Sequence, residues 1–221
     1  MFYKFPRTPH LRWLSSSPIK DDRLLSDAQR KDILSSPLII EEKIDGANLG
    51  FSLSEDGKIL AQKRGAYIDS VGQFAELDRW LRTHEDHLFD AISTNLILFG
   101  EWCAIKHSLY YTKLPDLWIM FDVYDINEEK FYNAERRNTL ARNAGVSTVH
   151  RIATRRFTEH ELLDLLGTDS TYKKGAIEGL VIRSENERWL EKRAKLVRPE
   201  FTRISTHWTR KRWVRNTIQR R

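Results

Sequence analysis

Apolar and polar residues along the chain follow two different spacings. Short apolar runs rich in Val, Ile, Leu and aromatic residues, bounded by polar turns, predict strands. Such runs occupy residues 37–43, 47–54, 58–63, 95–101, 117–124, 176–183 and 189–197. Helical spacing or helix-favouring end charges predict helices at 21–34, 72–92, 133–143 and 158–166. Strand-rich segments with helices between them indicate an α+β fold in which antiparallel sheets surround a cleft.

No boundary is visible inside the chain. It contains no internal repeat, no low-complexity segment and no linker rich in Pro and Gly. Its 221 residues suit one domain with a sizeable core. We therefore expect one domain at 1–198 and a short basic tail at 199–221, with a helix in the tail.

Positive charge is concentrated at the C-terminal end. The net charge is +6, and residues 201–221 contribute seven Lys or Arg and no acid, which leaves −1 for residues 1–200. Lys and Arg attract phosphates, and Trp208 and Trp213 can stack on bases, so this stretch favours a polyanionic partner. The alternative is a helix that closes the domain and exposes a charged face to solvent.

The signals for cellular location are few. No apolar run approaches the roughly 18 residues of a membrane span, and the N-terminus lacks the apolar segment of a secretion signal. The single cysteine, Cys103, cannot form an intramolecular disulfide, which favours a reducing, cytoplasmic location. We expect Cys103 to pack as a small apolar residue rather than to act as a nucleophile.

Two histidines, His84 and His87, lie three residues apart within the predicted helix at 72–92. This spacing can place two metal ligands on one helix face, but no third ligand accompanies them. We therefore favour one half-buried and one exposed histidine over a metal site.

The stretch IIEEKIDGAN, residues 39–48, contains Lys43 at the start of a Lys-Ile-Asp-Gly sequence. One interpretation is local: an apolar strand ends, Asp45-Gly46 forms a hairpin turn, and Lys43 lies on the surface. The other is that Lys43 forms a covalent bond. Given the Lys, Asp and Gly content, this tetrapeptide arises by chance in about one chain in twenty-five. Alone, it does not decide between them.

Three later stretches carry polar residues at the ends of apolar strands. They are Phe99-Gly100-Glu101-Trp102, Ala176-Ile177-Glu178-Gly179-Leu180-Val181-Ile182-Arg183 and Arg193-Ala194-Lys195-Leu196-Val197. Arg193 and Lys195 lie two apart on a strand, so their side chains point to the same face. Each stretch alone is typical of a solvated strand end. Together they supply two carboxylates for a metal ion and a ribose, and cations for a triphosphate.

In order and spacing, these stretches resemble the covalent nucleotidyltransferase superfamily of ATP-dependent RNA and DNA ligases and mRNA capping enzymes. The matching motifs are Lys43-Ile44-Asp45-Gly46, Gln62-Lys63-Arg64-Gly65, Gly100-Glu101, Phe121-Asp122-Val123-Tyr124, Glu178-Gly179-Leu180-Val181 and Arg193-Ala194-Lys195. They follow the family's order from residue 43 to residue 195. Their combination favours a covalent role for Lys43.

Within the superfamily, Lys-Ile-Asp-Gly-Ala-Asn most resembles the RNA ligase 2-like branch. The last motif departs from the usual Lys-x-Lys: either Arg193 replaces the first lysine, or Lys192 is its counterpart. The residues after Lys195 are fewer than the roughly 80–100 of the oligonucleotide-binding domain in DNA ligases and capping enzymes. This difference favours an RNA ligase.

The resemblance implies an ATP-grasp-like nucleotidyltransferase (adenylation) domain at 1–198 that uses ATP and Mg²⁺ or Mn²⁺. AMP would pass from ATP to Lys43 and then to a 5′-phosphate, from which a 3′-OH displaces it. The implied catalytic residues are Lys43, Asp45, Glu178 and Lys195, with Glu178 and Glu101 holding the metal ion. The implied ATP-binding residues are Glu42, Lys43, Arg64, Glu101, Phe121, Glu178, Arg193 and Lys195. The implied nucleic-acid contacts are Asn48, Arg64, Arg210, Lys211 and Arg212.

Lys43 has to be neutral to attack phosphorus. With an ordinary pKa near 10.4, only about one lysine in a thousand is neutral near pH 7. Nearby cations lower such a pKa, so we expect Lys195, Arg193 and the metal ion to favour the neutral amine. Asp45 would act in the opposite direction, and we expect it to be turned away or linked to the metal ion.

The sequence thus predicts a monomeric RNA ligase whose partner is RNA with nicked or single-stranded ends, and no membrane. Two enzymatic alternatives remain, a DNA ligase and a GTP-dependent capping-type enzyme. A third alternative is a nucleic-acid-binding module that keeps the fold without its chemistry.

Overall fold

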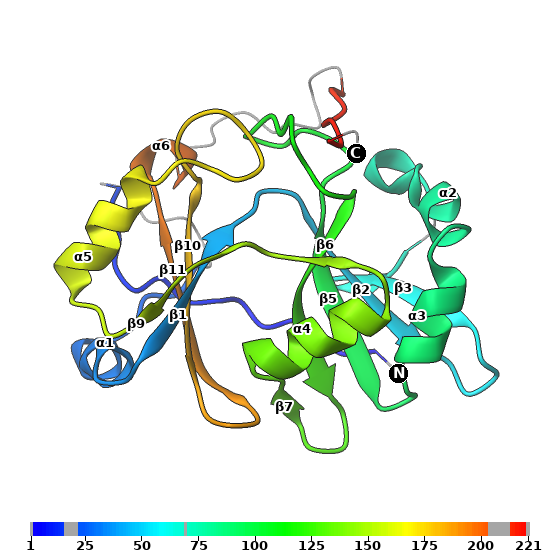
Figure 1. Ribbon diagram of the computed structural model, residues 1–221, viewed down its shortest axis with the longest axis horizontal. Coiled ribbons are helices and arrows are strands. Elements are labelled where there is room, and N and C mark those ends of the chain that lie inside the picture. The colour runs from blue at the N-terminus through cyan, green and yellow to red at the C-terminus, as the bar shows by residue number, and fades with distance from the viewer. Residues whose placement is uncertain (1, 16–21, 69, 203–212, 220–221) are drawn as a thin grey trace.

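The computed structural model describes residues 2–15, 22–68, 70–202 and 213–219, and consists of two β-sheets with helices packed on them (Figure 1). The first sheet has the strand order β11-β10-β1-β9, and the second has the order β4-β3-β2-β5-β6-β7, with β8 beside β6. Neighbouring strands are antiparallel, apart from the β6–β8 pair. This arrangement confirms the predicted α+β fold.

The first sheet packs on two helices. Its strands are β1 (Leu38–Lys43), β9 (Arg151–Arg155), β10 (Gly179–Glu185) and β11 (Leu190–Val197), and its helices are α1 (Asp27–Leu34) and α5 (Glu159–Asp164). Leu38 and Ile40 of β1 pack in one cluster with Ile33 of α1 and Leu162 of α5. Because side chains alternate along a strand, Glu41 and Lys43 face the other way, toward the second sheet.

The second sheet packs on the helices of residues 72–92 and on α4. Its strands are β2 (Ala47–Leu53), β3 (Ile59–Lys63), β4 (Ala66–Tyr67), β5 (Leu96–Trp102), β6 (Trp118–Asp125), β7 (Lys130–Phe131) and β8 (Ser147–Thr148). The helices are the 3₁₀ turn Gly72–Phe74, α2 (Leu77–Leu81), α3 (Glu85–Ala91) and α4 (Ala134–Asn143). Phe51, Trp80 and Trp118 lie at the centre of this core.

The continuous helix predicted at 72–92 is wrong, because the segment forms three separate pieces. The break between α2 and α3 lies at Thr83 and His84, whose side chains both hydrogen-bond to the carbonyl of Trp80, at 2.8 Å. Side chains that bond to the local backbone in this way compete with the helical hydrogen bonds. The His84 Nε2 atom also lies 3.0 Å from the Asp116 carboxylate, which is its partner on the other side of the ring.

The helix predicted at 21–34 begins later, at Asp27. Ser26 caps it: its side chain accepts from the Gln29 N–H, and the Gln29 side chain accepts from the Ser26 N–H. A capping box of this kind sets the start of a helix. Asp22 therefore lies outside the helix, where its side chain can reach β11.

The C-terminal part of the chain is helical only at α6 (Pro199–Thr202) in the described residues. Residues 213–219 are extended and form isolated bridges between Ile105 and Arg215 and between Leu114 and Ile218. Residues 203–212 lie outside the described part. The tail thus begins with a short helix, whereas the described segment 213–219 is not helical because it pairs with a loop.

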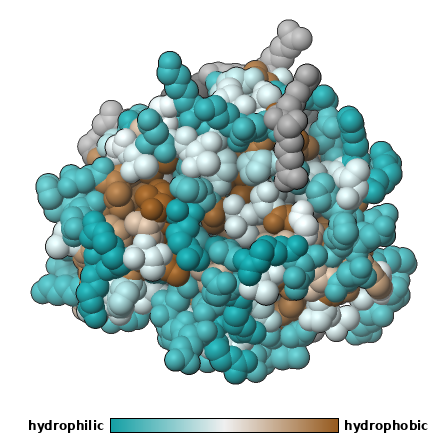
Figure 2. Space-filling model, in the orientation of Figure 1, coloured by the Kyte–Doolittle hydropathy of each residue, from teal (hydrophilic) through white to brown (hydrophobic). Residues whose placement is uncertain are grey.

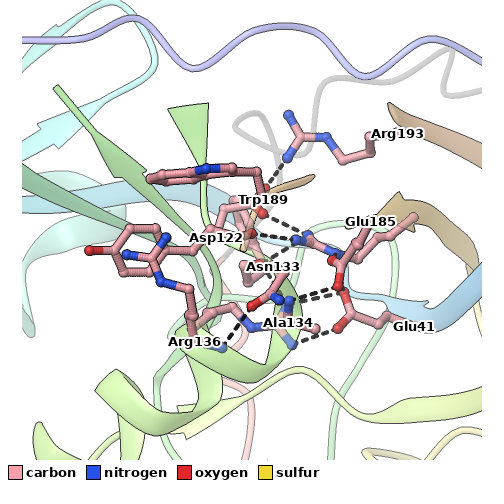
Figure 3. A network of polar contacts seen from close by, with 12 residues as sticks. Glu41, Asp122, Asn133, Ala134, Arg136, Glu185, Trp189 and Arg193 are labelled. Carbon is pink, nitrogen blue, oxygen red and sulfur yellow. Dashed lines mark hydrogen bonds and ion pairs between the residues drawn. The ribbon is translucent and has the colours of Figure 1, made fainter. Parts of the chain in front are cut away.

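A buried network of charges joins the two sheets (Figure 3). Arg137 of α4 binds both oxygens of Glu41, at 3.1 and 2.6 Å, and Arg183 of β10 lies 2.6 Å from both Asp122 and Glu185. Arg137 and Arg183 also donate to the Phe121 carbonyl, at 2.7 and 3.4 Å. The network therefore fixes the main chain of β6 against β1 and β10.

The outer surface is mostly polar on the face shown in Figure 2, where the apolar residues form separate areas among hydrophilic ones. None of the helices in the described ranges is long and apolar enough to cross a membrane.

Candidate active site

A cavity of about 470 Å³ lies between the two sheets. Lys43, Arg193 and Lys195 line it from the first sheet, and Glu101 and Phe121 line it from the second. Its size falls within the range of small-molecule and cofactor sites. Residues far apart in the sequence thus meet in one pocket.

Lys43 is the last residue of β1, and Glu178 faces it from the start of β10. The Lys43 Nζ atom donates to both Glu178 carboxylate oxygens, at 2.8 and 2.9 Å. Lys43 pairs with Gly179 in the sheet. A Cβ atom at Gly179 would lie 2.2 Å from the Leu196 carbonyl oxygen, so only glycine allows β11 to approach here. The Glu178-Gly179 sequence thus combines a carboxylate with close strand packing.

The turn after Lys43 packs against β5. The Gly46 N–H donates to Glu101, at 2.8 Å, and a Cβ atom at Gly46 would lie 2.5 Å from the Trp102 carbonyl oxygen. Glycine therefore brings Glu101 and the lysine motif together. The Asp45 carboxylate accepts from the backbone N–H groups of Ser108 and Leu109, at 2.6 and 3.0 Å. The Asp45 side chain thus binds a loop, but its charge still raises the pKa of Lys43.

The electrostatic environment of Lys43 differs from the prediction. Burial would lower the pKa of Lys43, but the charges of Glu178, Glu101 and Asp45 and the hydrogen bond to Glu178 raise it above its ordinary value. The carboxylates thus outweigh the expected effect of Lys195 and Arg193, while the expected contribution of a bound metal ion stays a prediction. Lys195 pairs with Asp22, and Arg193 pairs with Asp122.

Glu101 and Glu178 share one buried negative region. Burial raises the pKa of both, to about 8 for Glu101, and the Asp45 charge acts in the same direction while the Lys43 charge opposes it. No group of three His, Cys, Asp or Glu among the described residues could hold a metal ion. A Mg²⁺ ion, however, needs only one or two carboxylates when substrate phosphates supply further ligands. The two carboxylates therefore fit a divalent cation together with a phosphorylated substrate.

Lys195 is held by the N-terminal segment, which carries none of the family motifs. Its Nζ atom lies 2.9 Å from Asp22, and the same Asp22 oxygen bonds to His10 Nε2 at 2.9 Å. Residues 9–11 also pair with the backbone of Lys195. Burial lowers the pKa of Lys195, although its contact with Asp22 opposes this shift. No local pattern identified Asp22 or His10, because both act across a long sequence separation.

Arg193, and not Lys192, lies on the pocket side of β11. Arg193 forms an ion pair with Asp122, and its guanidinium lies 4.6 Å from the Phe5 ring centre. Lys192 points to the outside, where it lies 2.6 Å from Asp32. The placement agrees with Arg193 as the counterpart of the first basic residue in the motif.

Asn48 and Arg64 present unpaired polar atoms at the pocket wall. Asn48 Oδ1 and Arg64 Nε are buried without a hydrogen-bond partner among the described residues. A buried polar atom without a partner is costly, so a ligand that pairs with it would gain free energy. Asn48 and Arg64 are therefore the residues on this wall of the pocket that are best suited to hydrogen-bond a ligand.

Glu42 and Phe121 also line the pocket. The Glu42 carboxylate is held by the Ser170 hydroxyl and the Thr171 N–H, at 2.5 and 3.1 Å, and burial raises its pKa. Phe121 is half-buried and packs edge-on against Phe5, with ring centres 5.2 Å apart. Phe121 therefore has both a packing contact and a side toward the pocket.

The remaining candidates lie away from the pocket or outside the described residues. Cys103 is buried, and burial raises its pKa, which agrees with a packing role. His84 and His87 belong to no metal-binding group in the described ranges. Arg210, Lys211 and Arg212, as well as Trp208, fall outside the described residues. Trp213 is described, and its half-exposed ring lies beside Gly72.

Comparison with known proteins gives a consistent assignment. The family described as RNA ligase matches residues 36–197. No curated protein matches the chain. Similar solved structures include three of Naegleria gruberi RNA ligase. A mutant in the apo state has 16% identity and a TM-score of 0.60, over 90% of this chain and 62% of that chain.

Two further structures of that enzyme are similar. A mutant with ATP and Mn has 18% identity and a TM-score of 0.64, over 90% of this chain and 57% of that chain. The enzyme with PPi has 17% identity and a TM-score of 0.61, over 91% of this chain and 63% of that chain. This chain thus spans less than two thirds of the length of the ligase, and at these identities the likeness shows a common fold.

The ion pair at Lys43 gives a first testable prediction. Glu178→Gln removes the carboxylate that stabilises the ammonium, so the pKa of Lys43 should fall, by about one unit or more. The measurement is an NMR titration of the protein after ¹³C reductive methylation of its lysines. Glu42→Gln is the control, because Glu42 contacts Ser170 and not Lys43. An unchanged Lys43 titration in Glu178→Gln would contradict the assignment.

Proposed function

Because the chain belongs to the RNA ligase family, we propose that it is an ATP-dependent RNA ligase that acts through a lysyl-AMP intermediate on Lys43. The enzyme joins a 3′-OH to a 5′-phosphate after it has transferred AMP to the 5′-end. The observation that carries this proposal is the meeting of Lys43, Glu101 and Lys195 in one pocket between the two sheets, with Glu178 bound to Lys43 at 2.8 Å.

The first step forms a bond between Lys43 Nζ and the α-phosphorus of ATP while the bond to pyrophosphate breaks. Lys43 needs a free electron pair, so the ammonium must first lose a proton and its contact with Glu178. Mg²⁺ or Mn²⁺ held by Glu178 and Glu101 would neutralise phosphate charge and compete with Lys43 for the Glu178 carboxylate. The related ligase has been solved with ATP and Mn and with PPi, which supports these ligands.

The pocket walls suggest how ATP is oriented. Phe121 offers an aromatic ring for the adenine, and Glu101 lies where a carboxylate can accept from a ribose hydroxyl. Lys195 and Arg193 both line the pocket as cations for the phosphates, which would have to compete with Asp22 and Asp122 for them. Asn48 and Arg64, with their unpaired buried atoms, are proposed to contact the RNA ends.

The proposed function gives three predictions, of which the first concerns the covalent adduct. The protein incubated with labelled ATP and Mg²⁺ should retain label on denaturing gels, stable to base and labile to acid as expected for a phosphoramidate. Lys43→Ala should abolish this label completely. Lys58→Ala is the matched control, because the exposed Lys58 side chain lies in a turn and pairs with Asp56. Label on Lys43→Ala would contradict the assignment of Lys43 as the nucleophile. Labelling of the wild type by GTP would favour a capping-type enzyme. A wild type that takes no label from either ATP or GTP would favour a nucleic-acid-binding module.

The second prediction concerns Phe121. Phe121→Leu should raise the ATP concentration for half-maximal labelling about fivefold, because loss of one aromatic stack costs about 1 kcal/mol. Its melting temperature should change little. Phe99→Leu is the control: Phe99 is fully buried beside Phe5, so its loss should lower stability without changing the ATP requirement. The reverse pattern would make Phe121 a packing residue.

The third prediction concerns the basic cluster Arg210, Lys211 and Arg212, which we propose binds the RNA backbone. Replacing all three with Ala should reduce RNA sealing and flatten its salt dependence, by up to about 0.7 in slope for each lost phosphate contact. Lysine labelling should persist, because it needs only ATP. A variant with lysine at all three positions keeps the charge and should keep the salt slope. Sealing that is unchanged in the Ala variant would exclude this role.

A further inference from the structure

The turn that follows Lys43 is held by a loop, residues 103–114. The Asp45 carboxylate accepts from the N–H groups of Ser108 and Leu109, and the Asp45 N–H donates to the Tyr111 hydroxyl, at 2.8 Å. The loop therefore fixes both the side chain and the main chain of a residue two positions from Lys43. Leu109 and Tyr111 also pack in one cluster with Ile44.

The C-terminal strap, residues 213–219, lies along this loop. Lys106 N–H donates to the Val214 carbonyl at 2.7 Å, and Thr217 N–H donates to the Tyr111 carbonyl at 2.9 Å. The pairing continues from Leu114, whose N–H donates to Thr217 and whose carbonyl accepts from Gln219, at 3.1 and 2.8 Å. The strap thus contacts the loop along its whole length.

Asn216 connects the two ends of the loop. Its side chain is buried, with Oδ1 accepting from the Tyr111 N–H at 2.9 Å and Nδ2 donating to the Cys103 carbonyl at 2.8 Å. Its own N–H donates to the Ala104 carbonyl, at 3.1 Å. One amide side chain therefore fixes the distance between the residue that follows β5 and the residue whose hydroxyl binds Asp45.

We propose that Asn216 is a positioning residue for the reaction of Lys43. By joining the ends of the loop, it fixes the N–H groups that hold Asp45, and so fixes the backbone from which Lys43 extends. A small displacement of a reacting group can slow a reaction about a hundredfold, and side chains that support the reacting groups determine such precision. This inference rests on the proposed function and extends it to a segment outside the nucleotide pocket.

A residue that positions Lys43 affects the rate of lysine labelling and not the binding of ATP. Lys195 lies on β11 and makes no described hydrogen bond to the loop, and Phe121 of β6 meets the loop through apolar packing alone. Asn216→Ala should therefore slow lysine labelling at saturating ATP about tenfold, while the half-saturating ATP concentration stays within about twofold. Loss of stability alone would not produce this difference between the two quantities.

The experiment uses the full chain and four proteins: the wild type, Asn216→Ala, Arg215→Ala and Thr158→Ala. Arg215 belongs to the same strap, but its exposed side chain reaches Glu76, so its loss should leave labelling unchanged. Thr158 caps the distant helix α5, so Thr158→Ala lowers stability without affecting the loop. Labelling with ATP and Mg²⁺ is followed in single turnovers, below the melting temperature of every variant.

A second measurement does not depend on activity. Amide hydrogen exchange at Ser108 and Leu109, whose N–H groups bind Asp45, should rise about tenfold or more in Asn216→Ala and stay unchanged in Arg215→Ala. Unchanged exchange would overturn the proposal, as would wild-type labelling kinetics in Asn216→Ala. Slow labelling caused only by a higher ATP requirement would also overturn it. A wild type that takes no label would overturn the proposed function itself. A wild type that labels normally, together with an Asn216→Ala variant that does the same, would overturn only the role of Asn216.

Discussion

The two sheets depend on a set of buried arginine–carboxylate pairs at their junction. Arg137 and Arg183 connect Glu41 of the first sheet with Asp122 and the Phe121 carbonyl of the second. Such groups are costly to bury, and they remain charged only because each has good partners. Loss of one partner would leave an uncompensated charge at a cost of about 3–5 kcal/mol. The pocket therefore has a rigid floor, and its width is set by charge pairing as well as by apolar packing.

The same pairing principle governs the pocket itself. Lys43, Arg193 and Lys195 of the first sheet pair with Glu178, Asp122 and Asp22. A polyphosphate therefore gains contacts with these cations only by competing with the protein's own carboxylates. On the second sheet, Arg64 has no ion pair among the described residues and keeps a buried unpaired nitrogen. The two walls of the pocket thus differ. The first sheet presents cations that are paired with carboxylates, and the second sheet presents buried polar atoms without a partner among the described residues.

The sequence predicted the features that depend on local pattern. Short apolar runs predicted the seven main strands to within three residues, because burial on one or both faces dictates their composition. The edge strand β9 was missed, since its sequence Arg-Ile-Ala-Thr-Arg carries charges that are common at sheet edges. Three of the motif residues, Lys43, Glu101 and Lys195, line the same pocket, and Glu178 binds Lys43. Motif residues are informative because chemistry restricts their type as well as their order.

What the sequence could not predict were contacts between segments without a pattern of their own. Asp22 was read as part of a helix, yet it lies before the helix cap and binds Lys195, which is 173 positions away. The pKa of Lys43 was predicted in the wrong direction for the same reason. The direction of its shift is set by the charges of Glu178, Glu101 and Asp45, and the first two reach Lys43 from distant elements.

The lysine motif shows how far local chemistry depends on distant structure. Lys43, Asp45 and Gly46 are adjacent in sequence, but each is held by a different element: Lys43 by Glu178 before β10, Asp45 by the loop at 103–114 and Gly46 by Glu101 of β5. The loop is held in turn by Asn216, near the other end of the described chain. A four-residue motif can therefore supply the reacting groups, whereas the fold as a whole supplies their geometry. For this reason, a chance match of the tetrapeptide in an unrelated chain would carry no activity.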